Sequence, residues 1–187
     1  MDRFSAHWRH AEHREVMHTM GTISIRVMGE DDWALYRALR LQALQESPES
    51  FYSTYLHERD FTDQDWVDRI RKDGRGRHGL PLMAEVSGEP AGLALGLIDE
   101  RANKTASAYQ TWVSPAYRGL GVGRALLEQI ISWAETVRMD RLKMLVPLES
   151  DVAVGLATRC GFLPSGEILA LRPGSAVRLQ PMMLQLR

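Results

Sequence analysis

The chain has 187 residues, of which 44% are hydrophobic and 25% are charged, a composition typical of one globular domain with a full core. Its net charge of −1 excludes a general electrostatic attraction to nucleic acid or to an anionic membrane. The single cysteine, Cys160, excludes an internal disulfide and predicts a reducing, cytoplasmic location. No apolar run approaches the ~18 residues of a membrane span, and the polar N-terminus lacks the apolar segment of a signal peptide.

The first 20 residues are polar and contain four histidines at intervals of about three, the spacing of one helix face that could bind a metal. These are His7, His10, His13 and His18. The mixed polar composition favours a flexible, solvated extension without a metal. We therefore predict an N-terminal extension over residues 1–20 and a single domain over residues 21–187.

The first half of the domain predicts one strand followed by helical pieces. Residues 23–28 alternate apolar and polar side chains, which is the pattern of a strand. A helix follows, with Asp31 or Asp32 as its cap, and residues 47–50 end it. Residues 51–73 look helical in pieces, with Thr62 or Asp63 capping the second piece, and residues 74–79 form a loop. The apolar face of the first helix is expected to comprise Trp33, Leu35, Leu39, Leu41 and Leu44.

The second half alternates strands with two helices. We expect a hairpin of residues 80–86 and 91–99 around Gly88 and Pro90, and then a strand over 105–113. A long helix over 121–138 precedes a strand over 141–148. A short helix ends at Gly161, and two strands, 162–171 and 176–187, complete the chain. This order predicts an α+β or mixed α/β domain with at least one β-α-β crossover.

The stretch "YRGLGVG", Tyr117–Gly123, packs three glycines between a strand and a helix, and we call it the glycine loop. Helix N-termini present unpaired N–H groups with partial positive charge, and glycines let an anion approach them. The P-loop pattern fails because Arg124 and Ala125 stand where Lys and Ser or Thr are needed. The dinucleotide fingerprint fails because its third glycine is also missing. The pattern that remains is R-x-x-G-x-G.

The segment "VSPAYRGLGVGRALLEQIISWA", residues 113–134, resembles the acetyl-CoA-binding motif of the GNAT superfamily of N-acetyltransferases. Two further segments, "LRLQALQESPESFYST" and "CGFLPSGE", resemble the family's first helix with its acceptor loop and its usual glycine-phenylalanine ending. The likeness covers about residues 23–187. It implies a central, mixed, mostly antiparallel sheet of about seven strands, flanked by about four helices and splayed at an acyl-CoA cleft.

The resemblance also implies how acetyl-CoA, the co-substrate, is bound. Amides of the glycine loop would bind its pyrophosphate, and the preceding strand would pair with its pantetheine arm at Val113, beside Trp112. Ser150 stands where the family has an asparagine on a later helix. The implied pyrophosphate-binding residues are Arg118, Gly119, Gly121, Val122, Gly123 and Arg124.

The usual acid–base groups of the family are missing. The position of its tyrosine acid is Ala157, and the position of its glutamate base is Leu145. Positioning and a polarising backbone N–H can still supply much of the rate, with water carrying the amine proton away. The weak replacement candidates for a catalytic group are Tyr109 and Glu149; Asp151, Gln110 and Tyr117 are further possibilities.

The acceptor site is expected in the helical stretch after the first strand. Phe51 and Tyr52 are the candidate substrate-binding residues, with Tyr55 and Trp66 nearby, although core packing explains these aromatics equally well. A basic stretch from Arg71 to His78 could meet the 3′-phosphate of CoA or an anionic substrate, or could simply be solvated. Its basic members are Arg71, Lys72, Arg75, Arg77 and His78.

The sequence therefore predicts an N-acetyltransferase that moves an acetyl group from acetyl-CoA to a primary amine by direct attack in a ternary complex. The acceptor would be a small molecule or a peptide. We expect no metal, nucleic acid or membrane partner, and either a monomer or a homodimer. The alternatives are an acyl-CoA-binding module without catalytic activity and, third, an interaction protein that does not bind CoA.

Overall fold

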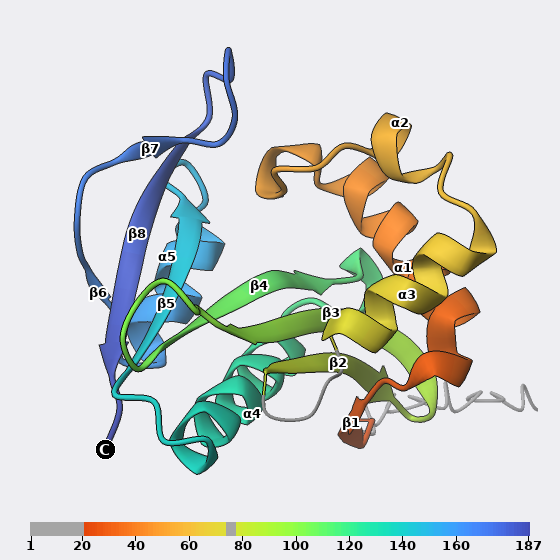
Figure 1. The fold of residues 1–187 in the computed structure, drawn as a ribbon, viewed down its shortest axis with the longest axis horizontal. Helices are drawn as coiled ribbons and strands as arrows, with labels where there is room; N and C mark the ends of the chain where they lie inside the picture. Colours follow the sequence, from red (N-terminus) through yellow and green to blue (C-terminus); the bar gives the residue numbers. More distant parts are fainter. Residues whose placement is uncertain (1–20, 74–77) are drawn as a thin grey trace, which may run out of the picture.

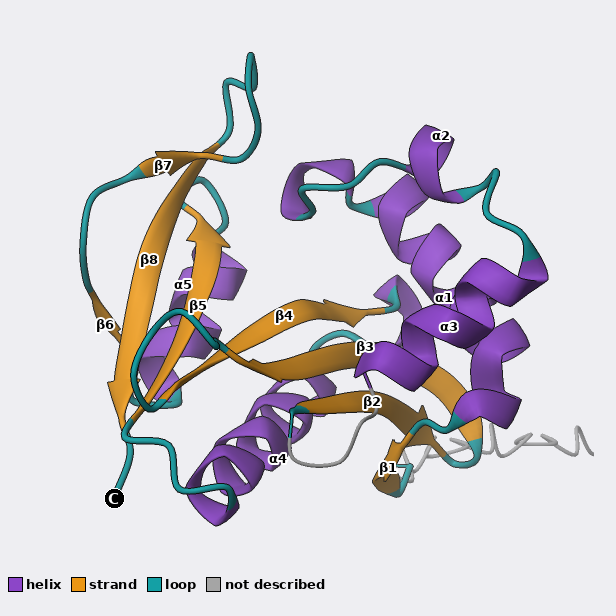
Figure 2. Ribbon diagram, viewed as in Figure 1, coloured by secondary structure: helices purple, strands orange, loops and turns teal. Residues whose placement is uncertain are grey.

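The computed structural model describes residues 21–73 and 78–187, where an eight-stranded sheet carries helices on both faces (Figures 1 and 2). The sheet order is β1-β2-β3-β4-β5-β8-β6, and β7 also pairs with β8. Residues 1–20, with the predicted extension and the histidine cluster, lie outside the described residues. The strands are β1 (Ile23–Val27), β2 (Gly79–Val86), β3 (Glu89–Ile98), β4 (Thr105–Val113), β5 (Arg141–Pro147), β6 (Leu163–Pro164), β7 (Leu169–Ala170) and β8 (Arg178–Gln185). The helices are α1 (Trp33–Glu46), α2 (Tyr55–Glu58), α3 (Asp63–Asp73), α4 (Val122–Thr136) and α5 (Asp151–Arg159), with 3-10 turns η1 (Glu30–Asp32), η2 (Pro48–Ser50) and η3 (Pro115–Tyr117).

The sheet is mixed but mostly antiparallel, which confirms the predicted fold class. Among the described strands, only β4 and β5 pair in parallel, and α4 forms the crossover between them. One predicted element was wrong: the segment 162–171, before the last strand, is not one strand. It contains the two-residue strands β6 and β7, because Gly166, with φ of 70°, turns the chain between them.

Side chains alternate between two cores because successive residues of a strand point to opposite faces. Leu82, Ala84 and Val86 of β2 belong to the larger cluster, which α4 and α5 cover. Met83 belongs to the smaller cluster under α1 and α3. The hairpin between β2 and β3 turns at Ser87 and Gly88, which both have positive φ, so Pro90 lies inside β3 and not in the turn.

Helix α1 buries a face different from the predicted one. Leu39 and Leu44 are buried as expected, but Leu35 and Leu41 are only partly buried, and Arg40 is 3% exposed. Asp32 occupies the position before α1 without capping it by a side-chain hydrogen bond. The Asp32 carboxylate instead accepts two hydrogen bonds of 2.9 Å from Arg26, six residues earlier in the chain. The predicted cap of α3 is confirmed at Thr62, whose hydroxyl accepts from the Asp65 N–H at 3.2 Å.

Among the described helices, none has the length and apolar character needed to cross a membrane.

Candidate functional site

The two parallel strands at the centre of the sheet part halfway along their length (Figure 2). Thr105 to Ala108 of β4 pair with Arg141 to Met144 of β5, and the pairing ends there. A bulge between Leu93 and Leu95 shifts the β3–β4 register, opposite Gln110, whose φ is 54°. Beyond Ala108, the edge of β4 that faces β5 therefore has no strand partner.

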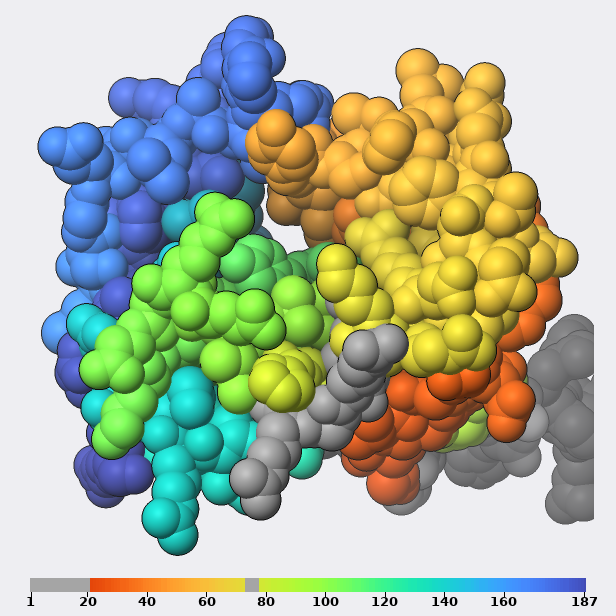
Figure 3. Space-filling model, in the orientation of Figure 1, coloured from red at the N-terminus to blue at the C-terminus, as the bar shows by residue number. Residues whose placement is uncertain are grey.

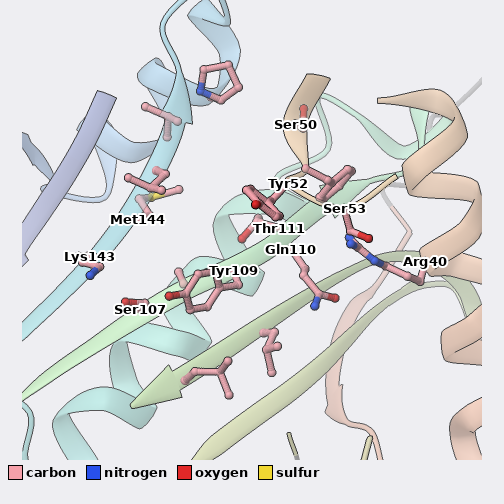
Figure 4. A pocket seen from close by; sticks show the side chains of 18 of the residues that line it. Arg40, Ser50, Tyr52, Ser53, Ser107, Tyr109, Gln110, Thr111, Lys143 and Met144 are labelled. Atoms are coloured by element: carbon pink, nitrogen blue, oxygen red, sulfur yellow. The ribbon is translucent and has the colours of Figure 1, made fainter. Parts of the chain in front are cut away.

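A cavity of about 550 Å³ opens at this gap, and the space-filling view shows the surface hollowed between the C-terminal strands and the α1–α3 side (Figure 3). Strands β3, β4 and β5 supply its floor, and α5 supplies one wall. The loop after α1 and side chains of α1 and α3 supply the opposite wall. Figure 4 shows Lys143 and Met144 at one end, Arg40 at the other, and Tyr109, Gln110 and Thr111 between them.

Residues 118–121 of the glycine loop are exposed at the start of α4, while the Val122 side chain is buried in the core. Gly119 and Gly121 have φ of 79° and 93°, in the left-handed region that glycine adopts without strain. Ala125 donates to the Gly121 carbonyl at 3.0 Å, closing the first turn of α4. The N–H groups that begin a helix have no partner inside it, so those of residues 122–124 remain available to an anion.

The two arginines of this region direct their side chains back onto the protein. Arg118 donates to the Val113 carbonyl at 3.0 Å and to Glu46 at 2.6 Å. Arg124 donates to Glu128 at 2.7 Å, one turn further along α4. Both guanidinium groups are therefore engaged within the protein, and ligand binding by the loop amides stays a prediction.

Glu46, at the end of α1, connects the glycine loop to the segment that follows α1. Its carboxylate accepts from Arg118, from Ser47 and from the indole N–H of Trp112 at 2.9 Å. Burial raises the pKa of Glu46, but these hydrogen bonds and the charge of Arg118 outweigh burial and lower the pKa to about 2. The carboxylate is therefore ionised throughout the physiological range. The Trp112 ring is buried in the smaller core, and Trp112 does not line the cavity.

Of the two candidate catalytic groups, the structure brings only Tyr109 to the cavity. The Tyr109 side chain lines it and is 43% exposed. Glu149 does not line the cavity, and its carboxylate lies 3.6 Å from Arg178 at the surface. Leu145, at the family's glutamate position, lines the cavity with an apolar side chain, and Ala157 is fully buried.

Of the other predicted residues, some line the cavity and others have structural roles. Phe51 and Tyr52 both line the cavity, with Phe51 buried and Tyr52 71% exposed. Ser150 caps α5, because its hydroxyl accepts from the Ala153 N–H at 3.2 Å. Trp66 is a core residue, with no exposed surface. Tyr55 is half-buried against the same core.

The basic stretch does not act as one unit. Arg71 pairs with Glu30 at 2.8 Å, away from the cavity, and His78 lies 4.0 Å from Glu100. Lys72 alone among the described members lines the cavity. Arg75 and Arg77 lie outside the described residues.

Sequence reasoning missed a buried ion cluster on the side of the cavity that α1 and α3 form. Arg40 donates two hydrogen bonds to Glu58, of 2.9 and 2.8 Å, and Arg69 lies 3.0 Å from the same carboxylate. Both arginines line the cavity. The spacing of Arg40 could have indicated its burial, because Arg40 lies four residues after Tyr36 and four before Leu44 on the buried face of α1.

Three polar side chains of β4 also lie at the cavity. Sequence reasoning did not single out Ser107 and Thr111, and it gave Gln110 only as a further possibility. Ser107 and Thr111 line the cavity, and their buried hydroxyl oxygens have no hydrogen-bond partner among the described residues. Gln110 accepts at 2.9 Å from the Tyr36 hydroxyl, which ties the bulge of β4 to α1. Such positions could not be chosen from the sequence, because their place in the lining depends on where the pairing of β4 with β5 ends and on the bulge between β3 and β4.

Neither thiol nor metal chemistry is indicated by the described part of the chain. Cys160 lies outside the cavity lining, and burial raises the pKa of its thiol, which disfavours a thiolate. No group of three or more His, Cys, Asp and Glu side chains that could hold a metal occurs within residues 21–73 and 78–187.

Comparisons with known proteins agree with this geometry. The family model of the acetyltransferase (GNAT) family matches residues 40–162. A GNAT acetyltransferase from Streptococcus pneumoniae has a TM-score of 0.74 and 20% identity, over 89% of this chain and 100% of that one. YncA from Salmonella typhimurium, solved with acetyl-CoA, has a TM-score of 0.73 and 19% identity, over 88% of this chain and 94% of that one.

A third similar structure is spermidine N-acetyltransferase from Vibrio cholerae, solved with CoA and spermine. It has a TM-score of 0.71 and 16% identity, over 87% of this chain and 95% of that one. At these identities the three structures show a shared fold, while the family model covers most of the chain. The fold, the parted strands and the family match together show that this chain belongs to the GNAT family of acetyltransferases.

Proposed function

We propose that the protein transfers an acetyl group from acetyl-CoA to a primary amine by direct attack in a ternary complex. The observation that carries this proposal is the place of the cavity. It opens where β4 leaves β5, and the exposed glycine loop follows β4 after one 3-10 turn. A phosphate-bearing molecule held at the loop can therefore extend along the free edge of β4 into the cavity.

The residues present fit the pyrophosphate and the pantetheine arm of acetyl-CoA. Amides of Gly119 to Arg124 would hold the diphosphate, with Gly121 leaving the approach open. The edge of β4 beyond Ala108 would pair with the amides of the pantetheine arm, as far as Val113, whose carbonyl already accepts from Arg118. When bound, acetyl-CoA supplies an activated thioester carbonyl. Trp112 would contribute to this binding through its backbone, because its indole N–H is donated to Glu46. Ser150 would contribute indirectly, because it caps α5, which forms one wall of the cavity.

The reaction balances without a further reactant. The nitrogen lone pair of the amine forms the new C–N bond, the C–S bond breaks, and the sulfur leaves as a thiolate. The amine loses one proton and the thiolate gains one, so the products are an acetamide and CoA with a free thiol. Holding both reactants in one cavity removes much of the entropic barrier to this attack.

The cavity lining shapes the path of that proton. Among the described lining residues there is no Asp, Glu or His side chain. The proton of the amine therefore leaves through water, and the neutral amine is the reacting form. Tyr109 carries an exposed O–H group on β4, the strand that borders the gap, and we assign it to protonate the leaving thiolate.

Replacing Tyr109 with Phe is expected to lower kcat by roughly 10²-fold, the typical contribution of a general acid. The acceptor KM should change little, because the phenyl ring keeps its packing. Steady-state kinetics at several pH values will measure this. A kcat within about threefold of the wild type, over the whole pH range, would show that water alone protonates the thiolate.

The function itself is tested by thiol release from acetyl-CoA in the presence of an amine panel, with mass spectrometry of the acetylated products. The absence of carboxylate and histidine from the lining favours one alternative, a module that binds acyl-CoA without catalysis. Calorimetric binding of acetyl-CoA with no thiol release for any amine would select that alternative. Turnover that saturates with both substrates supports the transferase.

A further inference from the structure

The end of the cavity formed by α1 and α3 is basic. The described lining contains four cationic side chains, Arg40, Arg69, Lys72 and Lys143, and no acidic one. Lys143 lies at the opposite end, between the strands, and pairs with Asp99 at 3.0 Å (Figure 4). The other three basic side chains come from α1 and α3, where the acceptor would enter beside Phe51 and Tyr52.

The two arginines at this end share one carboxylate. Glu58 is 1% exposed, accepts both hydrogen bonds from Arg40 and lies 3.0 Å from Arg69. The remaining terminal nitrogen of Arg40, Nη1, is buried and has no hydrogen-bond partner in the described structure. The Phe51 ring lies against this guanidinium, 4.6 Å from Cζ. A buried N–H group without a hydrogen-bond partner is unusual. If the Phe51 ring moved aside, an oxygen of the substrate that reached Arg40 would therefore be bound favourably.

Lys72 adds an exposed charge at the mouth of the same end. It follows Arg69 by three residues on α3, so the two side chains lie on the same helix face. No ion pair of Lys72 occurs among the described residues. The positive potential at this end would therefore repel an ammonium ion and attract an anion.

We propose that the acceptor is a small amine that also carries a carboxylate, with the carboxylate held by Lys72 and Arg69 and the amino group directed to the gap between β4 and β5. The inference rests on the proposed transferase function and names its substrate class. An amino acid has this chemistry, whereas a polyamine has only positive charges. The same cations favour the neutral form of the bound amine, which suits a cavity whose described lining lacks a carboxylate or histidine base.

Matched pairs of acceptors test the carboxylate directly. We would compare L-glutamate with its bis-amide, L-phenylalanine with L-phenylalaninamide, and β-alanine with β-alaninamide, with spermidine as the polyamine. The expected result is a kcat/KM at least about tenfold higher for the acid in each pair that reacts, with spermidine poorest. The test is stringent, because the amide of an α-amino acid has the less basic amine and so more of the neutral nucleophile near pH 7. Equal or faster reaction of the amides overturns the proposal.

Lys72→Gln separates the acceptor site from the donor site. Because Lys72 is exposed, the change should raise the KM of the carboxylate acceptor about fivefold, with the KM of acetyl-CoA unchanged. The control is Lys104→Gln, an exposed lysine outside the cavity that pairs with Asp140 at 3.5 Å, and it should change neither KM. A rise confined to the KM of acetyl-CoA would assign Lys72 to the 3′-phosphate of CoA and overturn the proposal.

Failure of the transferase function can be told apart from failure of this inference. If no amine is acetylated, the proposed function fails, and the CoA-saturated protein is titrated calorimetrically with each acid and its amide. Tighter binding of the acids, lost in Lys72→Gln, still supports an anion site at α1 and α3. Equal or undetectable binding overturns it.

Discussion

Gly121→Glu is expected to raise the dissociation constant of acetyl-CoA at least about 100-fold and to remove acetyl transfer with it. The new carboxylate would stand at the N-terminus of α4, where it competes for the free amides and repels the diphosphate of the ligand. An added Cβ meets nothing closer than Ile23, at 4.0 Å, so the first atom of the new side chain fits without a clash. The effect therefore comes from charge and from the strained φ of 93°, and isothermal titration calorimetry measures it.

Two substitutions separate charge from backbone strain. Gly121→Ala carries the strain without the charge and should weaken binding much less. Gly174→Glu adds the same side chain at another exposed glycine of positive φ, 77°, in the turn between β7 and β8, and should leave binding unchanged. Thermal melts of all three variants show whether the fold is intact. Retention of acetyl-CoA binding within about threefold in Gly121→Glu would contradict the assignment of this loop to the pyrophosphate.

Glu58→Gln is expected to lower the free energy of unfolding at pH 7 by about 3–5 kcal/mol, the usual cost of breaking a buried ion pair. The substitution leaves the Arg40 guanidinium, 3% exposed, without a counter-charge and weakens its two hydrogen bonds. Urea denaturation measures the change. The control is Glu128→Gln, which breaks an exposed pair with Arg124 of 2.7 Å and should cost no more than about 0.5 kcal/mol.

The effect of Glu58→Gln should depend on pH in a defined direction. Burial raises the pKa of Glu58, but the hydrogen bonds and charge of Arg40, with the charge of Arg69, outweigh burial, so the pKa lies below its ordinary value of 4.5. A lowered pKa in the folded state stabilises the protein above the pKa of the unfolded chain, and this stabilisation is lost as the pH falls. The difference between wild type and variant should therefore be largest near neutral pH and shrink below about pH 4.5. A difference under about 1 kcal/mol at pH 7 would show that Glu58 contributes little to the fold.

The local elements of the candidate site could be predicted from the sequence because they depend on neighbouring residues. Gly119 and Gly121 at positive φ, and a helix that begins directly after them, follow from glycine's backbone freedom and from the apolar period of α4. Residues 118–121 are exposed, and Arg118 and Arg124 turn back onto the protein, while the binding of a ligand by the loop amides stays a prediction. The family resemblance rested on this same local pattern.

The long-range features of the site could not be predicted in this way. The gap between β4 and β5 depends on where parallel pairing ends, at Ala108 and Met144, and these residues are 36 positions apart. The burial of Arg40 depends on Glu58 and Arg69, which reach it from α2 and α3. Trp66 and Trp112 could not be assigned to core or cleft from their own segments, because each lies against residues distant in the chain.

By itself the sequence determined the family, most of the order of elements and the glycine turn that begins α4, because helix starts, glycine turns and strand periods are set within a few residues. Only the tertiary structure decided which side chains line the cavity and what charge they bring to it. The physical reason is that burial and ion pairing are properties of the packed sheet and its helices, and a charge such as Arg40 can be kept in the interior only where the fold also brings Glu58 against it.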